Sequence, residues 1–177
     1  MEATGGSVRN VGQTRQGELQ MLGADGFLPG GRHQVTDDEF RHHFVDAFAG
    51  SRNRRRLFLR WQQHRKALLG LVPIEAQWLN GSYVTAKPEP GDIDVVSLID
   101  GPTFEALPEG ERLLVNSLLA GKQTKAVWSM DSYGVLLYPD GHPGKSTTEH
   151  WLVHWDWEWS RVRGDDDALK GYLEVRP

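Results

Sequence analysis

The chain has 177 residues, 38% of them hydrophobic, a formal net charge of −4 and no cysteine. The length is typical of one domain with a buried core, and the lack of cysteine excludes disulfides, thiolate metal sites and cysteine nucleophiles. The negative charge argues against nonspecific nucleic-acid binding by the whole surface but leaves room for one basic face. No apolar stretch approaches the ~20 residues that span a bilayer, and no signal-peptide region begins the chain, so we expect a cytoplasmic protein outside the membrane.

The first predicted elements are an arm and a helix. Residues 1–26 are rich in Gly, Gln, Thr and Asn without periodicity, which predicts a flexible N-terminal arm before a single domain over residues 27–177. After a Leu-Pro-Gly-Gly turn, Thr36 with Glu39 three residues on is typical of a capping box, so a helix is predicted through about Phe48.

A longer helix is predicted over residues 52–69. Its apolar side chains repeat on one face, and five arginines populate the others. Arg54, Arg55 and Arg56 fit two interpretations: a solvated helix face, or a clamp for the phosphates of a nucleotide or an RNA. The apolar residues of the stripe are Leu57, Trp61, His64 and Leu68.

Next, a short strand over residues 74–79 runs into Asn80-Gly81-Ser82. Glycine lets a backbone come close to a ligand, and successive amides at such a bend form an anion-binding nest. The Ser82 hydroxyl adds a further donor. This bend is therefore a candidate phosphate site.

After a spacer of nine residues, Asp92-Ile93-Asp94 opens an apolar run. Carboxylates at i and i+2 on a strand point from the same face, so the two can hold one ion. Placing acids in a buried strand is costly unless a cation or hydrogen bonds compensate. The alternative is a plain hairpin with exposed acids.

The second half of the chain predicts a helix over residues 109–120 and a third strand over residues 126–138. Asp131 lies within that strand, or else it belongs to a turn that splits the strand in two. Asp140, in a Pro-Asp-Gly turn, and Asp156, on a helix, are weaker candidate acids.

A Trp-rich helix is predicted over residues 147–161, followed by a solvated loop at 165–167 and a closing strand at 172–175. Its tryptophans at i+4 spacing indicate a core stripe and, with less support, a stacking platform. His150 and His154 have metal-ligand spacing, but the glutamate of a zinc hydrolase motif is missing between them.

With its Gly81-Ser82, spacer and Asp92-Ile93-Asp94 strand, the sequence resembles the nucleotidyltransferase superfamily with the DNA polymerase β type of fold. It is also similar to a family of small bacterial nucleotidyltransferase-like proteins. The features behind the second likeness are Leu28-Pro29 with His33, the arginines at 52–56 and Lys170-Gly171. The resemblance implies an α/β (α+β) nucleotidyltransferase-like fold, with a small mixed sheet flanked by helices.

The resemblance further implies that Gly81 and Ser82 hold phosphates and that Asp92 and Asp94 ligate Mg²⁺ or Mn²⁺. Asp131 is the candidate third carboxylate, which completes the metal site and deprotonates the acceptor. Lys87 is the candidate replacement for a basic phosphate contact.

The implied activity moves a nucleoside monophosphate from a triphosphate to a hydroxyl on a protein or on RNA, tRNA included. Relatives with this activity often act in toxin–antitoxin or phage-defence settings, so a toxin or antitoxin is a further expected partner. The alternative is a non-catalytic nucleotide-binding or regulatory module with the same fold.

Overall fold

The computed structural model of the chain describes residues 21–177, apart from the side chain of Asp166. Five strands form one mixed sheet in the order β1-β7-β2-β3-β4, and two more form a short ribbon. The strands of the sheet are β1 Gly31–Val35, β2 Ile74–Asn80, β3 Ile93–Asp100, β4 Met130–Leu137 and β7 Gly171–Val175. The ribbon pairs β5 Arg161–Val162 with β6 Asp165–Leu169.

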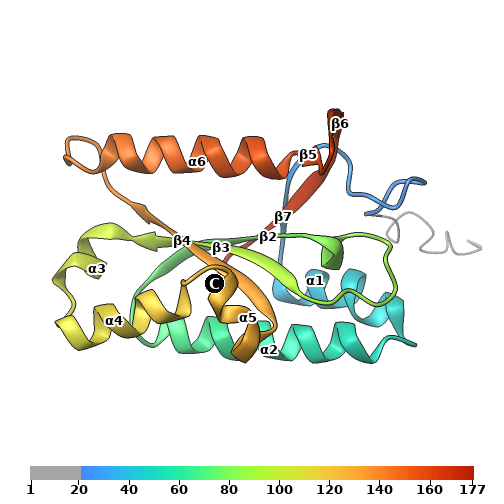
Figure 1. Ribbon diagram of the computed structural model, residues 1–177, viewed down its shortest axis with the longest axis horizontal. Helices are drawn as coiled ribbons and strands as arrows, with labels where there is room; N and C mark the ends of the chain where they lie inside the picture. The colour runs from blue at the N-terminus through green and yellow to red at the C-terminus, as the bar shows by residue number, and fades with distance from the viewer. Residues whose placement is uncertain (1–20) are drawn as a thin grey trace, which may run out of the picture.

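Helices cover both faces of the sheet (Figure 1). α6 lies alone over one face, whereas α1, α2, α4 and α5 lie on the other. The α-helices are α1 Asp37–Phe44, α2 Arg52–Leu69, α3 Gly101–Ala106, α4 Glu109–Leu118, α5 Lys125–Trp128 and α6 Lys145–Trp159. Short 3-10 turns are η1 Asp46–Phe48, η2 Ser82–Val84 and η3 Lys122–Thr124. This arrangement confirms the predicted α+β class with a mixed sheet flanked by helices.

Strand alternation divides the core between the two faces. Beneath α2, the sheet presents residues such as Leu79, Val95 and Leu173, which pack with the phenylalanines of α1. Beneath α6, it presents a second apolar cluster that includes Trp78 and Val96. Since β3 and β4 run parallel while β2 and β3 run antiparallel, the end of β2 and the starts of β3 and β4 meet at one edge of the α6 face.

Several predicted elements are confirmed. Thr36 caps α1 through the expected reciprocal bonds with Glu39, and α2 spans 52–69 with its apolar stripe buried. α1 ends at Phe44, however, and the predicted last turn is the separate η1. Phe48 is only half-buried there, with the Arg54 guanidinium 3.7 Å from its ring centroid.

Three predictions need correction. The strand expected over 126–138 is one turn of helix, α5, followed by β4, because Ser129 adopts a left-handed conformation (φ 58°) that breaks the chain direction between them. Residues 165–167 begin strand β6 and do not form a loop, since a turn at Gly164 folds them back on β5. Strand β1 was not predicted; it pairs with β7 in parallel.

The tryptophans of α6 form a core stripe only in part. Trp159 is buried and Trp155 half-buried, but Trp151 is exposed because the side of α6 that faces the sheet carries Thr148, Leu152, Trp155 and Trp159.

The predicted arm over 1–26 falls mostly outside the described residues, which begin at 21. Met21 and Leu22 pack against the core, and the Gly26 carbonyl accepts a hydrogen bond from the Ala86 amide. Within residues 21–177, no helix combines the length and apolar character needed to cross a membrane.

Candidate active site

Two of the three predicted acids lie side by side on the α6 face of the sheet. Asp94 on β3 is the direct register partner of Asp131 on the parallel strand β4. Neighbouring strands lie about 4.8 Å apart, and register partners in a parallel pair point to the same face. Asp131 is therefore a strand residue whose carboxylate shares a face with that of Asp94.

Lys125 joins the third acid to this pair. Its ammonium, at the start of α5, forms an ion pair with the Asp92 carboxylate and lies 3.8 Å from Asp131 Oδ1. That distance is too long for a hydrogen bond, and Asp131 Oδ1 is buried without a hydrogen-bond donor among the described residues. The structure thus places Lys125 beside Asp92 and Asp131, and Asp94 lies next to Asp131 on the neighbouring strand.

The clustering changes the acid–base properties of the side chains. Burial, together with repulsion from Asp92 and Asp131, raises the pKa of Asp94 to about 6. The hydrogen bond to Asp92 raises the pKa of Lys125. The positive charge near these carboxylates is too small to neutralise them, so an additional cation would stabilise the cluster.

The bend at Gly81 places the candidate phosphate loop against this cluster. Gly81 has φ +80°, and a Cβ added there would clash with the Asp94 carboxylate. Only glycine allows β2 to turn so close to the acid. Ser82 then starts the 3-10 turn η2, half-exposed beside the carboxylates.

Arg54 holds the loop after Ser82 in place. Its buried guanidinium donates to four backbone carbonyls at 2.6–3.0 Å, and burial lowers its pKa to about 10. Both interpretations of Arg54, a solvated face and a phosphate or RNA contact, are therefore wrong, because the side chain is fully buried and its two terminal nitrogens donate to carbonyls inside the fold. The carbonyls belong to Phe44, Tyr83, Thr85 and Lys87.

Lys170, which directly precedes β7, lies near the acids, whereas Lys87 does not. Lys170 Nζ donates to Asn80 Oδ1 at 2.9 Å, and burial lowers its pKa although the Asp94 charge opposes this effect. Lys87 is exposed and does not line the cleft that contains the acids. The structure thus places Lys170, and not Lys87, in the cleft with the acids.

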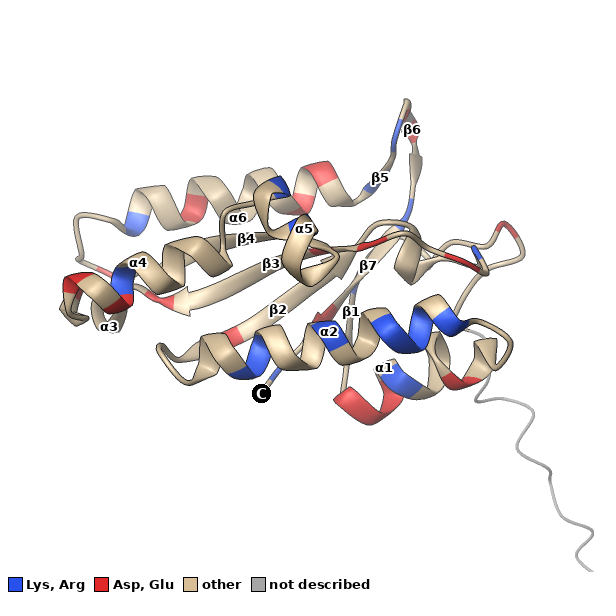
Figure 2. Cartoon of the chain, turned by 60° about the horizontal axis from the view of Figure 1, so that its bottom comes forward, with Lys and Arg blue, Asp and Glu red and all other residues tan. Residues whose placement is uncertain are grey.

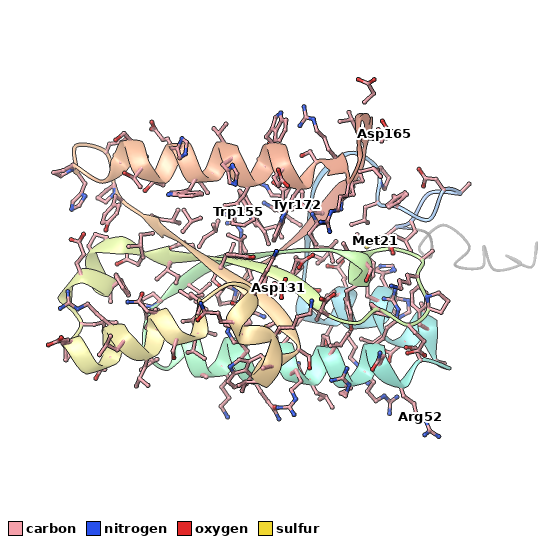
Figure 3. The ribbon with its side chains drawn as sticks, in the orientation of Figure 1. Met21, Arg52, Asp131, Trp155, Asp165 and Tyr172 are labelled. Carbon is pink, nitrogen blue, oxygen red and sulfur yellow. The ribbon has the colours of Figure 1, made fainter. Side chains whose placement is uncertain are left out.

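The three acids, the bend at Gly81 and Lys170 line a cleft of about 780 Å³ between the sheet edge, α6 and the β5–β6 ribbon. Figure 3 shows Asp131 at this edge, with Trp155 above it on the underside of α6. Trp155 packs on Tyr133, two residues along β4 from Asp131, with ring centroids 4.9 Å apart. The cleft also receives Lys122, Arg161 and Arg163. The cleft thus has carboxylates on its floor, aromatic rings on one wall and cations at its rim. This arrangement suits a nucleotide with its metal.

The donor set fits a hard divalent cation such as Mg²⁺, which prefers carboxylate oxygens. In the described part of the chain, no group of three or more Asp, Glu or His side chains is placed so that it could hold a metal ion. The Lys125 ammonium pairs with Asp92 and lies near Asp131, while Asp131 Oδ1 has no hydrogen-bond donor within residues 21–177. About half of the Lys125 side chain is exposed.

The weaker candidates lie elsewhere. Asp140 is exposed and pairs with Lys145 at 2.9 Å, and Asp156 accepts a hydrogen bond from the Tyr172 hydroxyl. His150 and His154 are exposed on α6. None of these four lines the cleft.

Sequence reasoning missed the structural role of Arg54 and the places of Lys125 and Lys170. For Arg54 a signal existed: residues 54, 58, 61, 65 and 68 repeat at helical spacing, so Arg54 lies on the buried stripe of α2. Lys125 and Lys170 precede strands that only the tertiary fold brings to the same edge.

The sequence was compared with known families, curated proteins and solved structures. Residues 21–176 match the family described as "Family of unknown function (DUF6932)". The chain belongs to DUF6932. In this DUF6932 protein, the matched residues include the five-stranded sheet and the acids Asp92, Asp94 and Asp131. No curated protein and no solved structure matches it.

Proposed function

We propose that this DUF6932 protein is a Mg²⁺-dependent nucleotidyltransferase, which moves a nucleoside monophosphate from a triphosphate to a hydroxyl on a protein or an RNA. The observation that carries the proposal is the arrangement of Asp92, Asp94 and Asp131 at one sheet edge, directly beside Gly81 and Ser82. The resemblance to the nucleotidyltransferase superfamily rests on the same residues.

The residues around the loop would hold the triphosphate. The backbone amides that follow Gly81 and the Ser82 hydroxyl donate to phosphate oxygens, and the Lys170 ammonium neutralises part of their charge. Arg54 keeps the loop in shape through its four carbonyl contacts. Asp92 and Asp94 would hold Mg²⁺ or Mn²⁺, which when bound offsets the negative charge of the phosphates.

Asp131 would act on the acceptor. The acceptor oxygen attacks the α-phosphorus, the bond from that phosphorus to the bridging oxygen of the β-phosphate breaks, and pyrophosphate leaves with the electron pair. The hydroxyl proton passes to a carboxylate, for which we propose Asp131, whose Oδ1 is buried without a hydrogen-bond donor within residues 21–177.

The second candidate function is a non-catalytic nucleotide-binding or regulatory module. The observation in its favour is Lys125, whose ammonium already neutralises Asp92 and faces Asp131. A lysine that stays there during nucleotide binding would leave no room for the ion that transfer requires.

Label transfer separates the two functions. The purified protein is incubated with each α-labelled triphosphate, Mg²⁺ and a cell extract, beside an Asp92→Asn variant. The proposal predicts label on a protein band or on RNA with the wild type alone. Binding of triphosphate without any transfer supports the module, and neither binding nor transfer contradicts both.

A further inference from the structure

The outer face of α2 carries a concentrated positive charge outside the cleft. Arg52, Arg55, Arg56 and Arg60 line a shallow hollow of about 530 Å³ together with Leu59 and Gln63. Figure 2 shows these cations along α2, and Figure 3 shows Arg52 projecting from the start of that helix. The helix contains no Asp or Glu in a chain whose net charge is −4.

The four guanidiniums are not neutralised within the fold. Among the described residues 21–177, none of them forms an ion pair with a carboxylate. Arg56 donates to the neutral oxygens of Asn53 and Ser129, at 3.0–3.3 Å. Four such charges side by side repel one another. A polyanion that binds with phosphates between them relieves this repulsion, which favours its binding.

The hollow is adjacent to the mouth of the cleft. Arg56 contacts Ser129, which links α5 to β4 and lies two residues before Asp131. Lys122 and Lys125, which line the cleft, belong to the same η3–α5 segment. Figure 2 shows α5 between α2 and α6. Cations therefore continue from the α2 face around the start of edge strand β4 into the cleft.

The flank of α2 toward α1 suits an anion less well. Asp37, Asp38 and Asp46 line a hollow there with Arg41 and Arg55, and ion pairs of Asp37 with Arg65 and of Asp46 with Arg41 offset the positive charge. A membrane surface fits less well. A helix that lies in a bilayer interface needs an apolar stripe, but the stripe of α2 is buried and only Leu59 is exposed within the hollow.

We infer that the α2 face docks an RNA strand and leads its hydroxyl end to the cleft. Arginine forks bind the backbone phosphates, and the rings of Tyr133 and Trp155 offer stacking surfaces at the cleft. The use of this RNA as acceptor rests on the proposed transfer activity. The docking itself does not, because it needs neither the carboxylates nor the triphosphate.

The test is binding of a labelled RNA hairpin with a single-stranded 3′ tail to the full chain, without nucleotide or Mg²⁺, at several salt concentrations. The variant carries Arg→Gln at 52, 55, 56 and 60. The matched control removes the same charge elsewhere, with Gln at Arg41, Arg112, Lys145 and Arg176, which are at least partly exposed. Circular dichroism establishes that both variants fold.

We expect the α2 variant to bind at least about tenfold more weakly, and its plot of log affinity against log salt to flatten by roughly 3, since each lost phosphate contact removes about 0.7 from the slope. The control should stay within about threefold of wild type. If the α2 variant does not fold, Arg56→Gln alone should flatten the slope while Arg56→Lys keeps it.

Equal loss in both variants, absence of RNA binding by the wild type, or preference for anionic lipid vesicles over RNA would overturn the inference. Calorimetry with Mg²⁺-ATP and Mg²⁺-GTP on the wild type keeps the two proposals distinct. Triphosphate binding with no RNA binding by the wild type refutes only the docking surface, whereas RNA binding without triphosphate binding refutes only the proposed function.

Discussion

Replacing Asp94 with Asn should stabilise the protein when no metal is present, and the gain should grow with pH. The pKa of Asp94 rises from 3.8 to about 6 on folding, because the carboxyl is buried beside Asp92 and Asp131. Ionised Asp94 therefore opposes folding. Below pH 3.8 the carboxyl is protonated in both states and this penalty is absent; it develops as pH rises and is complete above pH 6.

The magnitude follows from the shift. One pKa unit corresponds to about 1.4 kcal/mol, so a shift of roughly two units gives a penalty of about 3 kcal/mol at pH 8. At pH 5, where the folded carboxyl is mostly protonated, the same relation gives about 1.6 kcal/mol. Asn has the shape of the protonated acid and no charge, so Asp94→Asn should gain approximately these amounts.

Urea unfolding followed by tryptophan fluorescence, at pH 5 and pH 8 with EDTA, measures the difference. The matched control is Glu149→Gln, which removes an exposed carboxylate from α6 and should change stability by less than about 0.5 kcal/mol at both values. An Asp94→Asn variant that is no more stable than wild type, or whose gain is the same at pH 5 and pH 8, would refute the description of a buried, repelling cluster.

Three further substitutions test residues of the loop and of the cleft near the Asp94 carboxylate. Arg54→Met should cost about 3 to 5 kcal/mol in urea unfolding, since it leaves buried carbonyls without donors, and a loss below about 1 kcal/mol would contradict an anchoring role. Lys125→Met should raise Mg²⁺ affinity severalfold in calorimetry because it removes the competing ammonium, whereas the control Lys122→Met should leave it unchanged. Equal Mg²⁺ affinity in wild type and Lys125→Met would show that the Lys125 ammonium does not compete with the ion. Gly81→Ala should weaken triphosphate binding at least about tenfold, because its φ of +80° and the contact with Asp94 leave no space for a methyl group, and unchanged binding would remove this bend from the site.

The sequence predicted those elements whose signals are local. The capping box at Thr36, the apolar stripe of α2 and the aliphatic run of β3 each carry a pattern within one element. The start of α1, the bounds of α2 and the apolar run of β3 formed as expected, although α1 ends one turn early and β3 begins after Asp92. Asp131 was predicted to share a sheet face with Asp94 because it lies in an otherwise apolar segment, and the register of β4 places it beside Asp94.

What the sequence did not predict depends on contacts between distant segments. β1 gains its partner from the C-terminal strand, about 140 residues away. The strand at 165–169 is polar because a two-stranded ribbon needs no buried face, so its run of acids was interpreted as a loop.

The lysines illustrate the same limit at the site. Lys125 and Lys170 approach the acids from α5 and from the segment before β7, and no spacing along the chain encodes that meeting. Lys87, nearer to Ser82 in sequence, turns outward because Arg54 binds the carbonyl of that residue and fixes the loop.

The most direct test of the central claim is single-turnover transfer of labelled nucleotide by wild type and Asp131→Asn, with triphosphate binding measured on the same samples. If Asp131 accepts the proton of the acceptor hydroxyl, its replacement should reduce the rate of transfer at least about a thousandfold, since that role belongs to the transition state. Triphosphate affinity should change by less than about fivefold. Transfer by Asp131→Asn at the wild-type rate, or no transfer by the wild type to any protein or RNA despite tight Mg²⁺-triphosphate binding, would contradict the account.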